Sequence, residues 1–316
     1  MSRIPISFLM PVKNGFQFLP RARVMISENC GALDEIIVIN DHSSDGTGDF
    51  LRSWAADDHR VRVIDNSGSG LVNALNLGLL SAQHSWVARF DVDDIYLPSR
   101  ISRQTSAITS KSVAIFSDYS LWTSSGKTLG TIPSGVDSDV VAISLLKSQR
   151  TPHPSALFSK SHVLEVGGYR TLDFPAEDLS LWLRLASVGE LISIPEAVLN
   201  YQISPNSVTS LNQEKMIQKR LDLLKEFPIA PKFEISISNR WKSIFGEYSS
   251  YPQVGFRRLL LFLDFANVAF GSGQGFSQLT TLFRMLTFLI LRPSTYVGVF
   301  QALCLLARKR CLSITN

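Results

Sequence analysis

Trp86-Val87-Ala88-Arg89-Phe90-Asp91-Val92-Asp93-Asp94 is the stretch from which the fold and the candidate site are best predicted. Its first half is mostly apolar and β-favouring, which predicts a buried strand over residues 86–91. Its second half places three carboxylates within four residues. Because ligands of open α/β sheets bind at the carboxyl edge of the sheet, we expect these acids to lie in a binding cleft.

The spacing of these acids also predicts a chemistry. Carboxylates this close repel one another, and a hard divalent cation such as Mg²⁺ or Mn²⁺ relieves the repulsion. Mg²⁺ usually takes one or two protein carboxylates and completes its coordination with substrate phosphates. The Asp-x-Asp pattern therefore favours a metal–diphosphate site, and a solvated acidic turn is the alternative.

The preceding residues predict strands that alternate with helices. The strands are expected at 6–10, where Pro11 should stop the first, at 35–41 and at 62–65, and the helices between them should end near residues 29, 56 and 82. This alternation is typical of a parallel sheet with helices on both faces. Asp41 and Asp91 would then lie at the same sheet edge, which favours a nucleotide site over an acidic turn.

Two common nucleotide-binding motifs are absent from the sequence. The first predicted strand is not followed by G-x-G-x-x-G, and no G-x-x-x-x-G-K-[ST] occurs. The chain is therefore not expected to be a dinucleotide-binding enzyme or a P-loop ATPase.

A second acidic pair, Glu177-Asp178, opens a predicted helix with apolar residues along one face. Acids in the first helical turn cap free N–H groups and favour the helix dipole, which would be a sufficient structural role. The alternative is a general base aimed into the cleft.

Composition indicates a globular chain with a large core and extra apolar surface. Its 316 residues are 45% hydrophobic and 18% charged, with a net charge of +4, and the basic residues form no long run that would indicate a nucleic-acid partner. The three cysteines, Cys30, Cys304 and Cys311, form no metal-binding pattern and fit a reducing cytosolic compartment. The amino-terminal residues lack the apolar core of a signal peptide.

From residue 251 onward the composition becomes apolar and basic. No stretch reaches the ~18–20 uninterrupted apolar residues that a spanning helix needs. We therefore expect helices within 254–310 to lie in a membrane interface, with Arg and Lys toward anionic head groups. Packing of these helices on the core or on a partner is the alternative.

Five motifs in order resemble the family 2 glycosyltransferases, which have a GT-A fold and transfer sugars from nucleotide donors with inversion. The resemblance covers about residues 3–210 and rests on Met10-Pro11-Val12-Lys13-Asn14-Gly15, on Val38-Ile39-Asn40-Asp41-His42-Ser43-Ser44-Asp45-Gly46-Thr47, on Ala74-Leu75-Asn76-Leu77-Gly78, on Phe90-Asp91-Val92-Asp93-Asp94, and on Ala176-Glu177-Asp178-Leu179-Ser180-Leu181-Trp182-Leu183-Arg184. Val166-Gly167-Gly168-Tyr169-Arg170 matches the usual segment before the Glu-Asp pair.

The resemblance implies a role for each matching residue. Pro11, Asn14 and Asp41 would line the nucleotide pocket, with Asp41 meeting the base. Asp91 would lie near the ribose and diphosphate, and Asp93 would bind Mn²⁺ or Mg²⁺ through the donor diphosphate. Asp178 would be the base that deprotonates the acceptor hydroxyl.

One segment departs from the family pattern. Members often carry Tyr-Arg-x-His-x-x-Ser after the last core strand, whereas this chain has Tyr201-Gln202-Ile203-Ser204-Pro205-Asn206-Ser207. The basic residues that could help to hold the diphosphate are therefore missing from this loop. His153 could replace them, or it could simply be fixed in a turn between two prolines.

These observations predict an α/β chain: a GT-A domain at 1–210, with a Rossmann-like, mixed and mostly parallel sheet and flanking helices, and a helical extension at 211–316. The expected activity is metal-dependent, inverting transfer of a sugar, most plausibly from a UDP-sugar, to a glycan or glycolipid in surface polysaccharide synthesis. The expected location is the inner face of a membrane. The alternatives are a soluble transferase, a nucleotidyltransferase, or a catalytically silent homologue that acts as a nucleotide-binding or scaffold subunit.

Overall fold

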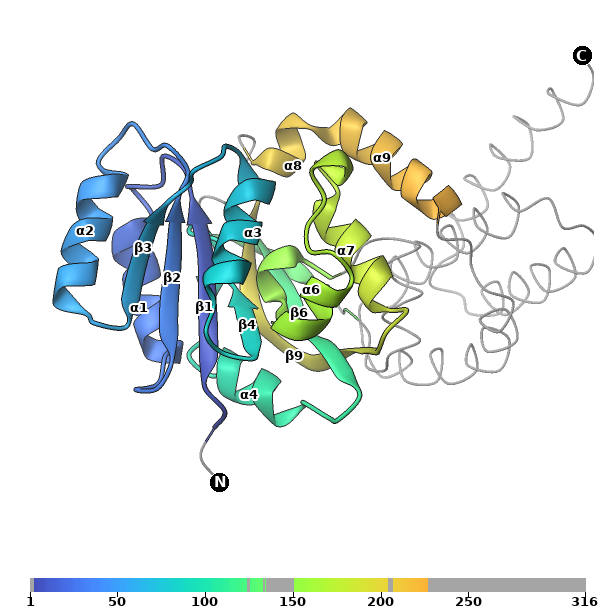
Figure 1. Ribbon diagram of the computed structural model, residues 1–316, viewed down its shortest axis with the longest axis horizontal. Coiled ribbons are helices and arrows are strands. Elements are labelled where there is room, and N and C mark those ends of the chain that lie inside the picture. The colour runs from blue at the N-terminus through green and yellow to red at the C-terminus, as the bar shows by residue number, and fades with distance from the viewer. Residues whose placement is uncertain (1–2, 124–125, 133, 135–150, 204–206, 227–316) are drawn as a thin grey trace, which may run out of the picture. The chain divides into compact units, whose positions relative to one another are not determined.

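The computed structural model describes residues 3–123, 126–132, 134, 151–203 and 207–226 (Figure 1). The chain divides into two units, Met1–Pro228 and Ile229–Asn316, and only the first contains described residues. The apolar, basic segments expected within 254–310 lie outside the described residues. Among the described helices, none is long and apolar enough to cross a membrane. The domain boundary at residue 210 stays a prediction.

The described strands form one mixed sheet in the order β3-β2-β1-β4-β8-β6-β9-β5, and β7 pairs with β6 at its side. The first four strands in this order are parallel, and β6 runs parallel to the long strand β9. The strands are β1 (Ile6–Val12), β2 (Glu35–Asn40), β3 (Val61–Asp65), β4 (Trp86–Arg89), β5 (Ile95–Tyr96), β6 (Ser112–Thr123), β7 (Thr128–Ile132), β8 (Leu157–Ser159) and β9 (Glu190–Ile203).

Helices cover both faces of this sheet because successive residues of a strand point to opposite faces. In β1, Phe8 and Met10 join the core that packs on α1, α2 and α4, while Leu9 packs against α3 on the other side. The described helices are α1 (Leu19–Asn29), α2 (Thr47–Asp57), α3 (Leu71–Ser81), α4 (Arg100–Ser106), α6 (Lys160–Glu165), α7 (Glu177–Leu185), α8 (Val208–Leu211) and α9 (Gln213–Glu226). The predicted mixed, mostly parallel sheet with flanking helices is confirmed.

The strand order creates a switch point between β1 and β4. From β1 the chain adds β2 and then β3 on one side, and it next places β4 on the other side of β1. The connections that leave the carboxyl ends of β1 and β4 therefore diverge to opposite sides. Ligands of open α/β sheets bind in the crevice at such a point. Pro11 lies next to the last residue of β1 and Asn14 follows that strand, whereas Asp91 follows β4.

The prediction that Pro11 stops the first strand is wrong. β1 continues to Val12, and Pro11 pairs in register with Ile39 of β2. The Val12 carbonyl accepts the Asp41 N–H on the β2 side, whereas the Leu9 carbonyl faces Phe90 on the β4 side. Backbone groups alternate sides along a strand, so Pro11 would face the β4 side, beyond the last β1–β4 pair at Leu9. A proline is tolerated there because no ladder N–H is needed.

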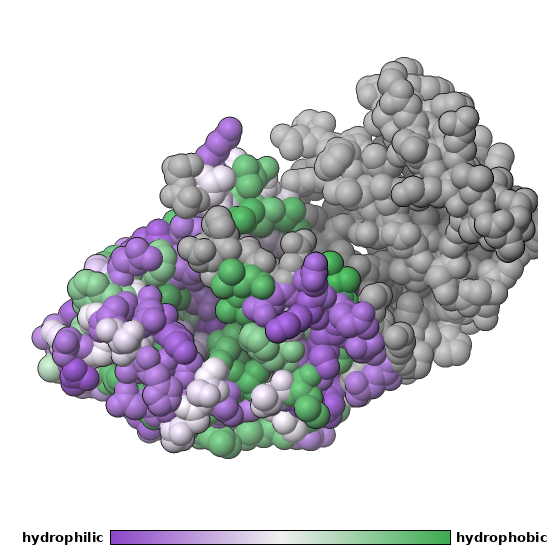
Figure 2. Space-filling view, turned by 90° about the horizontal axis from the view of Figure 1, so that it is seen from above, coloured by the Kyte–Doolittle hydropathy of each residue, from purple (hydrophilic) through white to green (hydrophobic). Residues whose placement is uncertain are grey.

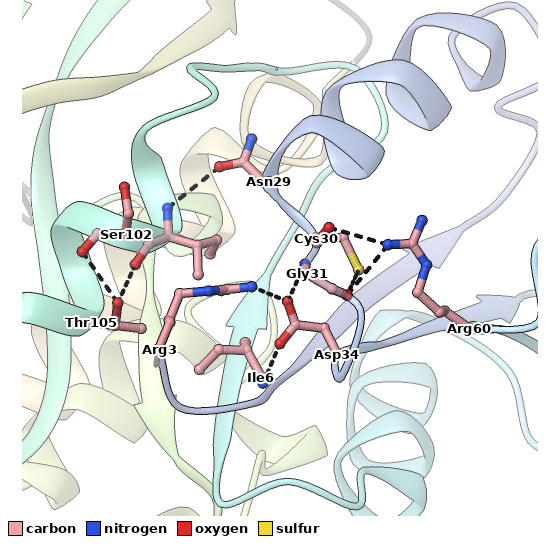
Figure 3. A network of polar contacts seen from close by, with 10 residues as sticks. Arg3, Ile6, Asn29, Cys30, Gly31, Asp34, Arg60, Ser102 and Thr105 are labelled. Atoms are coloured by element: carbon pink, nitrogen blue, oxygen red, sulfur yellow. Dashed lines mark hydrogen bonds and ion pairs between the residues drawn. The ribbon is translucent and has the colours of Figure 1, made fainter. Parts of the chain in front are cut away.

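A buried carboxylate fixes the opposite, amino-terminal end of the sheet (Figure 3). Asp34 is only 6% exposed, and its two oxygens accept the N–H groups of Ile6, at 2.7 Å, and of Gly31, at 2.6 Å. Arg3 forms an ion pair with the same carboxylate. On the neighbouring turn, Arg60 donates to the carbonyl of Cys30 at 3.1 Å. This network sets the start of β1 against the turn before β2.

Candidate active site

Asp91 is held at the end of β4 by contacts to both its side chain and its backbone. Arg89 forms an ion pair with the Asp91 carboxylate and is itself only 1% exposed. The Asp91 N–H donates to the Tyr96 hydroxyl at 2.6 Å, and that hydroxyl lies 3.3 Å from the Asp91 carbonyl. Beneath this turn the Arg100 guanidinium stacks 4.4 Å from the centre of the Phe90 ring. The first acid of the Asp-x-Asp pattern is therefore fixed on a rigid base.

Asp93 and Asp94 differ in burial and in partners. Asp94 is 2% exposed; one of its oxygens accepts the Gln202 N–H at 2.8 Å, and its Oδ2 has no partner among the described residues. Burial, and after it the nearby Asp91, raises the pKa of Asp94 well above its ordinary value. Asp93 is half-buried, and the same two causes raise its pKa to about 6, while the charges of Arg89 and Arg21 act in the opposite direction.

This segment fits a divalent cation. Burial and the Asp91 charge favour a proton on the Asp93 carboxylate, and a metal ion bound there would take the place of that proton. Phosphate oxygens of a substrate would complete the coordination of the ion. Within the described ranges, no group of three or more His, Cys, Asp or Glu side chains has the arrangement of a protein-only metal cage. A cation held by one or two carboxylates and by a diphosphate needs no such cage.

Asp41 lies at the end of β2 and is 5% exposed. Its Oδ1 accepts from Asn66 Nδ2 at 2.7 Å, and the Gly70 N–H lies 3.1 Å from each of its oxygens. A carboxylate offers about four acceptor positions, so Oδ2 retains room for one further donor. Asp41 is thus oriented by residues that follow β3.

Asn14 and Gly15 join the β1 and β2 ends of the site. The Asn14 side-chain oxygen accepts the Ser44 N–H at 2.8 Å, and the Asn14 N–H donates to the Ser43 hydroxyl at 3.0 Å. Asn14 has a φ of 51°, a left-handed conformation that asparagine tolerates better than most residues. A Cβ on Gly15 would lie 3.2 Å from a Val92 methyl group, so this loop packs closely on the Asp91–Asp94 segment.

Glu177 and Asp178 occupy the first turn of α7, as predicted. Asp178 is half-buried, and its Oδ1 accepts the N–H of Leu179 at 2.7 Å. Asp178 thus satisfies an N–H of the first helical turn, which is the structural role that the sequence left open. Glu177 is 4% exposed, and its Oε2 has no partner among the described residues. Burial, and after it the adjacent Asp178, raises the pKa of Glu177 to about 8.

Tyr169 connects the acids of β4 with those of α7. Its side chain is buried, and burial raises the pKa of its hydroxyl. The Arg89 charge opposes that rise, while the charges of Asp178, Glu177 and Asp91 add to it. One buried side chain therefore lies within electrostatic range of both acidic groups and of the arginine. Asp91 and Asp178 therefore both act on this one buried hydroxyl.

The segment before α7 is held in place by Asn76 of α3. Asn76 on α3 brackets the backbone of Tyr169, with its Nδ2 donating to the carbonyl at 2.8 Å and its Oδ1 accepting the N–H at 3.0 Å. A Cβ on Gly168 would lie 2.9 Å from Asn76 Oδ1, and Gly168 has a φ of 64°. Glycine is therefore needed at this position. The Asn76 and Gly168 motifs of the sequence thus act together to position α7.

His153 does not supply a positive charge. It is buried, and its Nε2 lies 2.8 Å from the Tyr169 hydroxyl. Burial, together with the nearby Arg89 charge, lowers its pKa well below the ordinary value. A neutral histidine in this position fits the structural role and not that of a diphosphate-binding cation.

Three residues of this region were not among the predicted site residues: Arg89, Asn66 and Arg21. Arg89 had a signal, since it is a lone charge in an otherwise apolar strand directly before the acids. Asn66 follows a parallel strand just as Asp41 and Asp91 do, and the same argument would have included it. Arg21 gave no signal, because its contacts are to residues 72 and 181 positions away.

Figure 2 faces the carboxyl edge of β1 and β2. Hydrophilic residues cover most of the side that holds α2 and β3, at the left of the view, and hydrophobic residues gather next to it. Asn14 and Asp41 follow β1 and β2, whose carboxyl ends form this edge. This distribution fits a polar ligand at the β1–β2 end of the site.

The burial of Glu177 predicts a pH-dependent stability. Its pKa is about 8 in the folded chain, above its ordinary value, so this group's contribution to stability is complete below about pH 4.5. The contribution is lost as the pH rises through 8, because the unfolded chain releases the proton earlier. We expect Glu177→Gln to change the melting temperature little relative to wild type at pH 5 and to raise it by several degrees at pH 9.

Thermal melting of wild type and Glu177→Gln at the two pH values measures this difference. Glu165→Gln, at an exposed position on α6, is the matched control and should give equal differences at both. A Glu177→Gln difference that is the same at pH 5 and pH 9 would contradict the buried, proton-binding state of Glu177.

Comparisons with known proteins agree with this architecture. Residues 7–131 match the family model described as Glycosyl transferase family 2. The amylovoran biosynthesis glycosyltransferase AmsE of Erwinia amylovora is 28% identical over 197 residues, which are 61% of this chain and 73% of the relative. Over residues 7–131 the chain is therefore similar to the family 2 glycosyltransferases.

Two solved structures share the fold. The mannosyltransferase PcManGT from Pyrobaculum calidifontis, in complex with GDP-Man and Mn²⁺, aligns with a TM-score of 0.58 at 15% identity, over 95% of this chain and 84% of its own. A fragment of S. aureus TarS in complex with UDP-GlcNAc aligns with a TM-score of 0.59 at 11% identity, over 84% of this chain and 81% of its own. The described fold is therefore that of the GT-A glycosyltransferases.

Proposed function

We propose that this protein is an inverting, metal-dependent glycosyltransferase that uses a nucleotide-sugar donor. The observation that carries the proposal is that two acidic groups, Asp91 to Asp94 after β4 and Glu177-Asp178 on α7, both contribute charges that act on the buried Tyr169 hydroxyl. The first group is suited to a metal–diphosphate, and the second to removing a proton. Glycosyl transfer from a nucleotide donor needs both.

On the donor side, the nucleotide would lie along the ends of β1, β2 and β4. Pro11 and Asn14 line this edge, and Asp41 offers an acceptor for a base N–H. Asp91 would lie near the ribose and diphosphate, and Asp93 would hold the cation. When bound, Mn²⁺ or Mg²⁺ would stabilise the negative charge that develops on the departing diphosphate.

On the acceptor side, Asp178 would take the proton of the attacking hydroxyl. The hydroxyl oxygen forms a bond to the anomeric carbon while the bond from that carbon to the diphosphate oxygen breaks. The proton goes to Asp178, and the electron pair leaves with the nucleoside diphosphate. A single displacement of this kind inverts the anomeric configuration. Glu177, whose pKa burial raises to about 8, holds its own proton near neutral pH.

The acceptor class is inferred from the relatives and from the sequence. AmsE acts in amylovoran biosynthesis by its name, which supports a glycan or glycolipid of a surface polysaccharide as acceptor. The apolar, basic residues 254–310 are proposed to bring the enzyme to the inner face of the membrane, where such acceptors would be reached. UDP is proposed as the carrier, in line with the UDP-GlcNAc complex of TarS.

Calorimetric titration tests the donor half of this proposal. UDP, GDP and dTDP are each titrated into the full chain, once with Mn²⁺ and once with EDTA. We expect one nucleotide to bind with a strong preference for Mn²⁺. If well-folded protein binds none of the three, the transferase proposal fails and a scaffold role is the better account.

A further inference from the structure

Arg21 places a cation on the segment that carries Asp93, the candidate metal ligand. It lies in the first turn of α1, which follows β1, so it is at the carboxyl edge of the sheet. Its Nη2 donates to the Asp93 carbonyl at 2.6 Å and lies 3.3 Å from Gln202 Oε1. These partners come from the loop after β4 and from the end of β9, so one side chain connects three elements.

The charge of Arg21 is not neutralised by these contacts, since both acceptors are neutral oxygens. Arg89 differs in this respect: it is buried, forms an ion pair with Asp91 and donates to the Phe90 carbonyl. Arg21 is exposed, and its charge acts on the Asp93 carboxyl. Of these two arginines, Arg21 is the one that a ligand can reach.

The guanidinium also has donors to spare. Both contacts use Nη2, whereas an arginine carries five N–H donors in a planar fork that suits phosphate oxygens. Nη1 can therefore donate to a phosphate oxygen while Nη2 keeps its place on Asp93 and Gln202. An exposed cation held in position beside a metal–diphosphate site costs little further ordering when the anion binds.

We propose that Arg21 binds the diphosphate of the donor nucleotide, next to the cation held by Asp93. This inference rests on the proposed function and deepens it. It also explains why this chain can have Gln202 at the position where members of the family that it resembles often have an arginine. In this chain Gln202 accepts a hydrogen bond from Arg21, so helix α1 supplies the positive charge that the loop after β9 lacks.

The competing explanation is that Arg21 only ties α1 to the ends of β4 and β9. Such a role would affect every nucleotide equally, whereas a diphosphate contact affects diphosphates more than monophosphates. The two explanations are separated by comparing UDP with UMP, or the corresponding GDP and GMP or dTDP and dTMP pair if wild type prefers it.

The experiment measures these affinities with Mn²⁺ for full-length wild type, Arg21→Gln and Arg23→Gln. Arg23 is the matched control, since it lies on the same helix and pairs with Asp57 at 3.1 Å. We expect Arg21→Gln to weaken diphosphate binding about 10-fold or more, as expected when charge-assisted hydrogen bonds are lost. Monophosphate affinity should change less than about threefold, and Arg23→Gln should match wild type within about twofold.

A double variant, Arg21→Gln with Gln202→Arg, moves the cation to the other side of the contact. We expect it to recover most of the lost diphosphate affinity, and binding no tighter than that of Arg21→Gln would overturn the link between Arg21 and Gln202. The main inference is overturned if Arg21→Gln binds the diphosphate as wild type does, or if it weakens both nucleotides by the same factor. Wild type that binds no nucleotide would instead overturn the proposed function itself.

Discussion

Asp178→Asn is expected to lower the rate constant for sugar transfer about 10²- to 10⁴-fold, the usual contribution of a positioned general base. Asparagine keeps the size of the side chain, and its oxygen can still accept the Leu179 N–H that Asp178 now accepts. Donor binding should therefore stay within about twofold of wild type. The measurement is the turnover rate at saturating donor and acceptor, together with calorimetric affinity for the nucleoside diphosphate.

Asp49→Asn is the matched control for this variant, because Asp49 is 86% exposed on α2 and pairs with Arg52 of the same helix. It should transfer sugar at the wild-type rate. If Asp178→Asn keeps more than about a tenth of the wild-type rate, another group takes the proton, and Glu177 becomes the candidate to substitute next. A parallel loss of donor affinity would instead mean that the helix start itself has been disturbed.

Asp93→Asn is expected to remove the metal dependence of nucleotide binding. Residues that merely support a metal ligand change metal affinity by about 10- to 100-fold when mutated, so loss of the ligand itself should cost about 100-fold or more. With Mn²⁺ present, the affinity of the variant for the nucleoside diphosphate should fall to the level that wild type shows in EDTA. In EDTA the two proteins should bind almost equally.

Asp65→Asn, at an exposed position at the end of β3, provides a control that also alters an acid at the carboxyl edge. Its affinity with Mn²⁺ should stay close to that of wild type. An Asp93→Asn protein that still binds tenfold more tightly with Mn²⁺ than with EDTA would show that the cation is held elsewhere, and Asp91 would be the next residue to test.

The sequence predicted the parts of the site that depend on where strands end. Asp41 and Asp91 follow β2 and β4 as expected, because an apolar run that stops at an acid marks both the strand and its carboxyl end. The first turn of α7 was placed correctly by the same local logic. The error at Pro11 came from treating proline as a strand breaker. Pro11 lies beyond the last residue of β1 that pairs with β4, so the strand loses no ladder hydrogen bond there.

Other features could not be predicted from local patterns. Nothing in Glu177-Asp178 tells which acid is buried, since that depends on what α7 packs against, and the structure buries Glu177 and leaves Asp178 half-exposed. The contact of Arg21 with Gln202 spans 181 positions and exists only because α1 and β9 meet at the sheet edge. The neutral state of His153 likewise depends on its burial beside Tyr169 and Arg89.

Identifying the nucleotide product tests the central claim most directly. The full chain is incubated with Mn²⁺, a nucleotide-sugar of the base that binds in calorimetry, and a lipid extract that contains candidate acceptors, and the nucleotides are separated by chromatography. A glycosyltransferase releases the nucleoside diphosphate, and Asp178→Asn should release about 10²-fold less or lower still. Release of pyrophosphate or of a sugar phosphate, or no product from a donor that binds well, would contradict the account.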